Sequence, residues 1–136
     1  LVAKINADPR PCVKYKESRP IADLKHMMET TVELYGDNVA FMQKDSNSEP
    51  YRSITYKEAF ADINGLGTAL IAKGLKDKRV AVIGENCYQW AISYLAAVCG
   101  VGVVVPLDKE LNAEELKQLV IRADVECVLF HKKHEA

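Results

Sequence analysis

The chain has 136 residues, of which 49% are hydrophobic and 27% charged, a balance typical of one globular domain with a core of its own. Its formal net charge of −1 argues against binding to nucleic acid or to an acidic membrane surface, since both attract proteins with a clear excess of basic residues. The four cysteines form no CxxC pair and are not spaced with the three histidines as zinc ligands, so we expect no metal site and reduced thiols, as in a cytoplasmic protein.

The first 36 residues divide into a lead-in and a helix. Residues 1–19 are polar and lack periodicity, so a loose lead-in is predicted and the folded part is expected to span residues 20–136. A helix is predicted from Ser18 to Gly36, with Ser18 as its cap and Pro20 in its first turn. Its apolar face is expected to comprise Ile21, Leu24, Met28 and Thr31.

A hairpin and a second helix are predicted next. Two short strands are expected at residues 39–43 and 51–55, joined by the polar turn 44–50. Thr55 and Glu58 are spaced as a capping box, in which each side chain accepts a hydrogen bond from a free backbone amide of the first turn. A helix over residues 55–74 follows from this start signal and from Gly74 at its end.

The second half of the chain alternates strands and helices. Non-alternating apolar runs at 79–84, 102–106 and 125–130 predict strands that are buried on both faces. Helices are predicted between them at 86–99 and 112–123, the second with Asn112 as its cap and Glu115 at the capping-box position. Because strand–helix–strand connections are right-handed, this order predicts an α/β fold with a parallel sheet built from βαβαβ units. The apolar stretch 91–107 is too interrupted by glycine and proline for a membrane span.

Ligands in such folds bind in loops at the carboxyl ends of parallel strands. Asn86 follows the first strand and is interpreted as a helix cap, with ligand contact as the alternative. Lys109 follows the second strand and is interpreted as part of a solvated turn, with contact to a phosphate as the alternative. Gly65 and Gly67 resemble a dinucleotide loop but fall inside a predicted helix, where close packing explains them better. Trp90 and Tyr94, four residues apart, are interpreted as core residues.

Two segments resemble the core motifs of the adenylate-forming synthetases. Ile-Thr-Tyr-Lys-Glu-Ala at 54–59 resembles the first motif, and Cys-Gly-Val-Gly-Val-Val-Val-Pro-Leu-Asp at 99–108 resembles the second. Gly-Leu-Lys at 74–76 and the strand 79–86 stand between them as in that family. Within the family, segments 35–38 and 84–90 look most like long-chain fatty-acid–CoA ligases. The resemblance covers roughly residues 20–130.

This resemblance implies part of the large N-terminal domain of the acyl-CoA synthetase fold. It implies an enzyme that uses ATP and Mg²⁺ to convert a carboxylate into an acyl-adenylate, which the thiol of coenzyme A then converts into a thioester. The family's phosphate loop, ribose-binding aspartate and C-terminal lysine are absent from this sequence. We therefore expect no catalytic residue here, an inactive chain without the remainder of a parent enzyme, and Lys109 as a candidate for a coenzyme A phosphate.

Two other functions remain open at this point. The chain could be a free-standing α/β binding or regulatory domain of flavodoxin-like type, or part of an adenylation domain for amino or aryl acids. For the parent ligase, a cytoplasmic or membrane-peripheral location and a fatty-acid substrate are expected. For the chain alone, self-association through apolar surfaces and sheet edges is expected.

Overall fold

The computed structural model describes residues 19–44 and 48–131. Apart from Arg19, the predicted lead-in lies outside the described residues, as do Ser18 and the middle of the turn 44–50. Helix α2 (Leu24–Tyr35) begins at Asp23, whose Oδ1 accepts a hydrogen bond from the His26 amide at 2.7 Å. The predicted start near residue 18 is therefore wrong: the capping carboxylate lies five residues later, and Ile21 remains 55% exposed in front of the helix.

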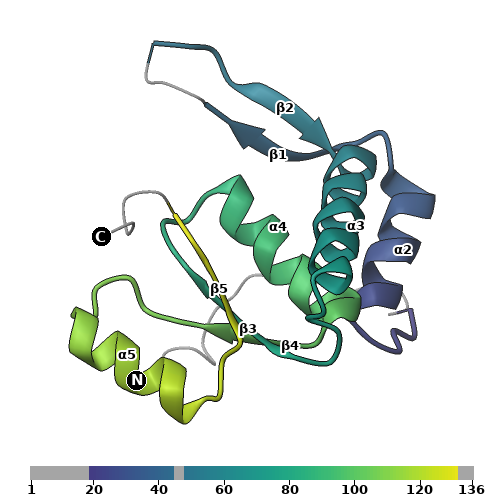
Figure 1. The fold of residues 1–136 in the computed structure, drawn as a ribbon. Helices are drawn as coiled ribbons and strands as arrows, with labels where there is room; N and C mark the ends of the chain where they lie inside the picture. Colours follow the sequence, from purple (N-terminus) through teal and green to yellow (C-terminus); the bar gives the residue numbers. More distant parts are fainter. Residues whose placement is uncertain (1–18, 45–47, 132–136) are drawn as a thin grey trace, which may run out of the picture.

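Strands β1 (Val39–Gln43) and β2 (Arg52–Thr55) form the predicted hairpin. They pair antiparallel, with an irregularity between Val39 and Phe41. Figure 1 shows this hairpin extending away from the helices. Helix α3 (Tyr56–Ala72) follows β2 directly and begins with the predicted capping box of Thr55 and Glu58.

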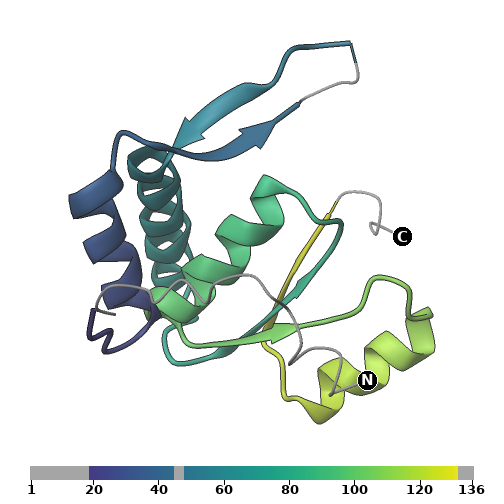
Figure 2. The same cartoon turned by 180° about the vertical axis from the view of Figure 1, so that it is seen from behind.

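The second half of the chain forms the predicted parallel sheet. Strand β3 (Arg79–Ile83) lies between β4 (Val103–Pro106) and β5 (Cys127–Phe130), and both pairings are parallel. Helix α4 (Tyr88–Ala96) and the π-helical turn η1 (Ala97–Val101) connect β3 to β4, and α5 (Ala113–Arg122) connects β4 to β5. Both connections are expected to be right-handed crossovers, but they run across the sheet in opposite directions, from β3 to β4 and from β4 to β5. As a result, α4 and α5 lie on opposite sides of the sheet (Figures 1 and 2).

Only β3 is buried along most of its length. Its residues 80–83 are at most 5% exposed, whereas Val103 of β4 is 55% exposed and Phe130 of β5 is 51% exposed. The prediction that all three strands are buried on both faces is therefore wrong for β4 and β5. They are the outer strands of this sheet, and α5 covers them poorly, since none of its described residues is buried.

Two apolar clusters hold these elements together. The first joins α2, the hairpin, α3 and α4, and the second joins α3, η1 and the sheet. The most deeply buried large side chains, none more than about 2% exposed, are Ile54, Ile63, Val80, Val82 and Val101. Gly65 and Gly67 lie inside α3, as predicted, and Gly67 lies where α3 packs against Ala96 and Val101.

Gly102 is required where β4 begins beside β3. A Cβ atom added there would lie 2.1 Å from the carbonyl oxygen of Lys78, far inside van der Waals contact. The next amide, that of Val103, donates to the same Lys78 oxygen at 3.0 Å. The close approach of the two backbones therefore places β4 in register with β3.

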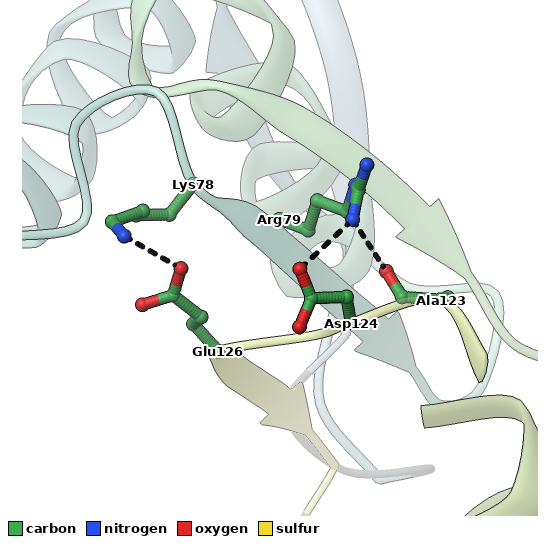
Figure 3. Close-up of polar contacts among 5 residues, drawn as sticks. All are labelled: Lys78, Arg79, Ala123, Asp124 and Glu126. Carbon is green, nitrogen blue, oxygen red and sulfur yellow. Dashed lines mark hydrogen bonds and ion pairs between the residues drawn. The ribbon is translucent and has the colours of Figure 1, made fainter. Parts of the chain in front are cut away.

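Ion pairs join the amino ends of β3 and β5 (Figure 3). Lys78 Nζ lies 2.8 Å from Glu126 Oε1, and Arg79 Nη1 lies 3.1 Å from Asp124 Oδ2 and 3.3 Å from the Ala123 carbonyl oxygen. The Glu126 carboxylate raises the pKa of Lys78. These exposed pairs contribute little stability individually, but they lie beside the backbone bond from Glu126 to Arg79 that sets the register of β5.

Candidate functional site

The carboxyl edge of the parallel sheet brings together the two loops that carry the sequence candidates. Residues 84–87 connect β3 to α4, and residues 107–112 connect β4 to α5. The amide of Leu107 donates to the carbonyl of Val82 at 3.0 Å, so the second loop leaves β4 beside the end of β3. Since the loops lead to helices on opposite faces, this edge contains a topological switch point, where α/β sheets bind ligands.

Lys109 lies at this switch point and is paired with carboxylates from both loops. Its Nζ is 2.9 Å from Glu110 Oε1 and 3.0 Å from Glu85 Oε2. The hydrogen bonds with Glu110 and then Glu85 raise the pKa of Lys109 well above the ordinary lysine value. Asp108 Oδ1 accepts from the Glu110 amide at 3.0 Å and stabilises the turn around Lys109. Lys109 is thus in a turn, but it also connects two loops.

Asn86 does not cap α4. The N-cap position is Cys87, and no side chain makes a capping hydrogen bond there. The cap interpretation is therefore wrong, because α4 begins one residue too late for the Asn86 side chain to occupy that position. Asn86 is exposed and lines an open hollow of about 620 Å³ between β1 and the start of α4.

A second hollow, of about 320 Å³, lies beside the carboxyl ends of β3 and β5. It combines apolar strand ends with polar side chains, a mixture found in small-molecule sites. Trp90 lines it and stacks on Tyr94, with ring centroids 5.5 Å apart. Both side chains are only half-buried and lie outside the buried core, so the interpretation of these two residues as core is wrong for this structure. The lining comprises Val82, Ile83, Gly84, Glu85, Cys87, Gln89, Trp90, Ser93, Val128, Leu129, Phe130 and His131.

Tyr88 anchors the first turn of α4. Its hydroxyl donates to Asp62 Oδ2 on α3 at 2.7 Å, and its ring meets Phe41 of the hairpin edge-to-face at 5.1 Å between centroids. Burial and the hydrogen bond to Asp62 raise the pKa of Tyr88 above its usual value. These contacts fix the end of the loop 84–87. Sequence reasoning missed them because Tyr88 and Asp62 are 26 residues apart and no local pattern links them.

Metal ligands and reactive thiols are the side chains that most often carry chemistry in a site of this kind. Within residues 19–44 and 48–131, no group of three or more histidine, cysteine, aspartate or glutamate side chains is placed to hold a metal ion. The cysteines Cys87, Cys99 and Cys127 are free thiols, and burial raises the pKa of Cys99 and Cys127, which disfavours the reactive thiolate. In the same described part, no helix is both long and apolar enough to cross a bilayer.

Comparison with known proteins relates these features to a family. Residues 28–136 match the model of the family described as AMP-binding enzyme. Long-chain-fatty-acid–CoA ligase 5 of Rattus norvegicus is 34% identical over 85 residues, which cover 60% of this chain and 12% of that protein. Malpinin synthetase of Mortierella alpina is 32% identical over 98 residues, covering 71% of this chain and 1% of that protein.

Solved structures show the same fold. The anthranilate CoA ligase AuaEII in complex with anthranoyl-AMP superposes with a TM-score of 0.73 at 15% identity, over 85% of this chain and 22% of that chain. The present chain thus spans only a small part of the proteins that it matches. Its sheet and helices have the fold of the N-terminal domain of adenylate-forming enzymes, and the chain belongs to the family of AMP-binding enzymes.

Proposed function

We propose that these residues are part of an ATP- and Mg²⁺-dependent acid–thiol ligase for long-chain fatty acids. The enzyme converts the fatty acid into an acyl-adenylate with release of pyrophosphate and then into a thioester with coenzyme A. Family membership supports the use of ATP. The observation that carries the substrate class is the 34% identity over 85 residues with a protein named as a long-chain-fatty-acid–CoA ligase.

The proposed role of residues 20–136 is structural support for a site completed elsewhere in the enzyme, with residues 1–19 as a lead-in. Adenylation needs groups that offset phosphate charge and that align the carboxylate with the α-phosphorus. Among the described residues at the carboxyl edge, Lys109 supplies a cation, and it is already paired with two carboxylates. We therefore place the catalytic groups in the larger part of the enzyme and expect the present chain alone to be inactive.

Two residues are proposed to contact ligands in the whole enzyme. Lys109 is proposed to contact a coenzyme A phosphate, because it lies at the switch point of the sheet. Asn86 is proposed as a weaker polar contact from the neighbouring loop, because its side chain is exposed beside an open hollow. A cytoplasmic enzyme at the periphery of a membrane is proposed, because long-chain fatty acids partition into bilayers.

A second candidate is the adenylation of aryl or amino acids. The fold is shared with an anthranilate CoA ligase, and malpinin synthetase is nearly as similar in sequence as the fatty-acid ligase. A free-standing binding domain is less well supported, because the matched segment is 12% of the length of the rat ligase.

Substrate comparison in the full-length protein tests the proposal. Purified enzyme receives ATP, Mg²⁺ and coenzyme A with palmitate, acetate, anthranilate or mixed amino acids, and pyrophosphate release and acyl-CoA are measured. If the enzyme is a fatty-acid ligase, we expect it to form both pyrophosphate and acyl-CoA, and palmitate to give the highest kcat/KM of the four substrates. Activity confined to anthranilate or amino acids would retain the family chemistry and remove the fatty-acid assignment.

A further inference from the structure

Three charged side chains meet at the switch point: Lys109, Glu85 and Glu110, here called the Lys109 cluster. Glu85 comes from the loop after β3, and the other two come from the loop after β4. The ammonium of Lys109 donates to both carboxylates, at 3.0 Å and 2.9 Å. The single ammonium of the cluster is therefore shared between two carboxylates from different loops.

Backbone contacts hold the two loops of the cluster in place. The loop after β4 is fixed by the bond from Leu107 to Val82 and by the Asp108 side chain, which accepts from the Glu110 amide. The loop after β3 ends at Tyr88, which is bonded to Asp62. Glu85 thus reaches Lys109 between two anchored backbones, and it also lines the 320 Å³ hollow. Because these bonds hold both loops, we expect the pair to separate by rotation of its side chains.

We propose that Glu85 is an internal competitor for Lys109, which a phosphate-bearing ligand must displace when it binds at the switch point. The inference rests on the proposed function, which supplies two such ligands, ATP and coenzyme A. A phosphate oxygen and the Glu85 carboxylate are both anionic acceptors for the same ammonium, so they compete for it. Glu85 therefore lowers the affinity of the site for phosphate and helps the ligand to leave.

The competitor role and a merely structural role predict opposite results for Glu85→Gln. Glutamine keeps the size of the side chain and can still accept a hydrogen bond, but it has no charge. If Glu85 competes with phosphate, removing its charge tightens ligand binding. If Glu85 only holds Lys109 and the loop in place, the same substitution weakens binding. Because the side chains of Lys109 and Glu85 are 34% and 40% exposed, solvent screens the pair and the effect is moderate.

The test uses the full-length enzyme as wild type, Glu85→Gln, Lys109→Gln and the double variant. Calorimetric titrations with ATP and with coenzyme A give each Kd, and thioester formation gives the KM of each ligand. We expect Glu85→Gln to lower the Kd of one ligand by about 2- to 5-fold, the effect of an exposed ion pair. Lys109→Gln should raise that Kd and remove most of the effect of Glu85→Gln. The ligand that responds identifies the source of the phosphate.

Glu126→Gln is the matched control, because it breaks a comparable pair with Lys78, 2.8 Å long, at the opposite edge of the sheet (Figure 3). It should leave both Kd values unchanged. Unchanged or weaker binding of both ligands by Glu85→Gln would overturn the inference, as would an unchanged Kd in Lys109→Gln. A different result would contradict the proposed function: ATP and coenzyme A bind, but no carboxylate supports pyrophosphate release.

Discussion

Thr55→Ala removes one half of the capping box that joins the hairpin to α3. Thr55 Oγ1 accepts from the Glu58 amide at 3.2 Å, and Glu58 Oε2 accepts from the Thr55 amide at 2.7 Å and from Thr55 Oγ1 at 2.8 Å. The substitution leaves the Glu58 amide without this acceptor and takes one donor from the carboxylate. The bond from the Thr55 amide to Glu58 remains.

The size of the effect follows from the other amides of the first turn. Those of Tyr56 and Lys57 donate to the carbonyls of Asn38 and Gly36, at 3.1 and 3.0 Å, and do not depend on the Thr55 side chain. One amide therefore loses its partner, at an exposed site where water can replace it. The expected loss is about 1 kcal/mol in the free energy of unfolding, rather than the upper end of the capping range at about 2 kcal/mol.

Urea unfolding of the 136-residue chain, followed by circular dichroism at low protein concentration, measures this loss. Thr55→Ser keeps the oxygen and should retain most of the stability. Asn112→Ala removes the equivalent cap of α5, in which the Glu115 amide donates to Asn112 Oδ1 at 2.9 Å. Because α5 has no buried residue in the described structure, we expect only its first turn to fray. A loss below about 0.3 kcal/mol for Thr55→Ala, or an equal loss for Thr55→Ser, would refute the capping argument.

The Glu58 half of the box adds a pH dependence. The bonds from Thr55 lower the pKa of Glu58 below its ordinary value. A lowered folded pKa means that this stabilisation is fully present above the pKa of Glu58 in the unfolded chain and is lost as the pH falls through the folded pKa. The stability of Glu58→Gln should therefore approach that of the wild type in acid, and a constant difference down to pH 2 would contradict this assignment.

Four further outcomes are expected. Ile63→Ala should lower the free energy of unfolding by about 2–5 kcal/mol, whereas Ile121→Ala, at a 68% exposed position, should change it by less than about 0.5 kcal/mol in the same urea titrations. Gly102→Ala should lower the free energy of unfolding by about 1–3 kcal/mol, because the added Cβ overlaps the Lys78 carbonyl. Gly65→Ala, in open space within α3, should raise it by about 0.5–1 kcal/mol, and a change of the same sign for both variants would contradict this view. Tyr88 should ionise above the usual tyrosine range when absorbance at 295 nm is followed with pH, and Tyr88→Phe should remove that late-titrating fraction. Because burial and the bond to Asp62 raise the pKa of Tyr88 in the folded state, its contribution to stability is lost as the pH rises above about 10. The isolated chain should self-associate in sedimentation at micromolar concentration, because β4 and β5 are outer strands with exposed apolar side chains, and a stable monomer would count against this expectation.

Elements with local signals were predicted well from sequence. The capping boxes at Thr55 and Asn112 depend on residues three positions apart, and both are present. The apolar run at β3 and the alternation of strands and helices predicted the parallel sheet correctly. Helix starts were less reliable where several polar residues compete: Asp23 rather than Ser18 precedes α2, and Cys87 rather than Asn86 precedes α4.

Features that depend on distant neighbours were not predictable. The apolar composition of β4 and β5 does not reveal that they lie at the edges of this sheet, since exposure depends on what packs against them. Lys109 was identified as a candidate from its place after a strand. Its partner Glu85 was not, because the two are 24 positions apart and meet only through the order of the strands. Sequence reasoning thus located the edge of the sheet but not its ion pairs.

The decisive measurement is the exchange of radiolabelled pyrophosphate into ATP in the presence of palmitate. It compares the full-length protein with the 136-residue chain side by side. We expect palmitate-dependent exchange by the full-length protein, without any requirement for coenzyme A, because the acyl-adenylate forms before the thiol reacts. We expect neither exchange nor ATP binding in the micromolar range by the 136-residue chain. Exchange by the chain alone would contradict the view that the catalytic groups lie outside it. Absence of exchange by the full-length protein with every carboxylate tested would contradict the assignment of the activity itself.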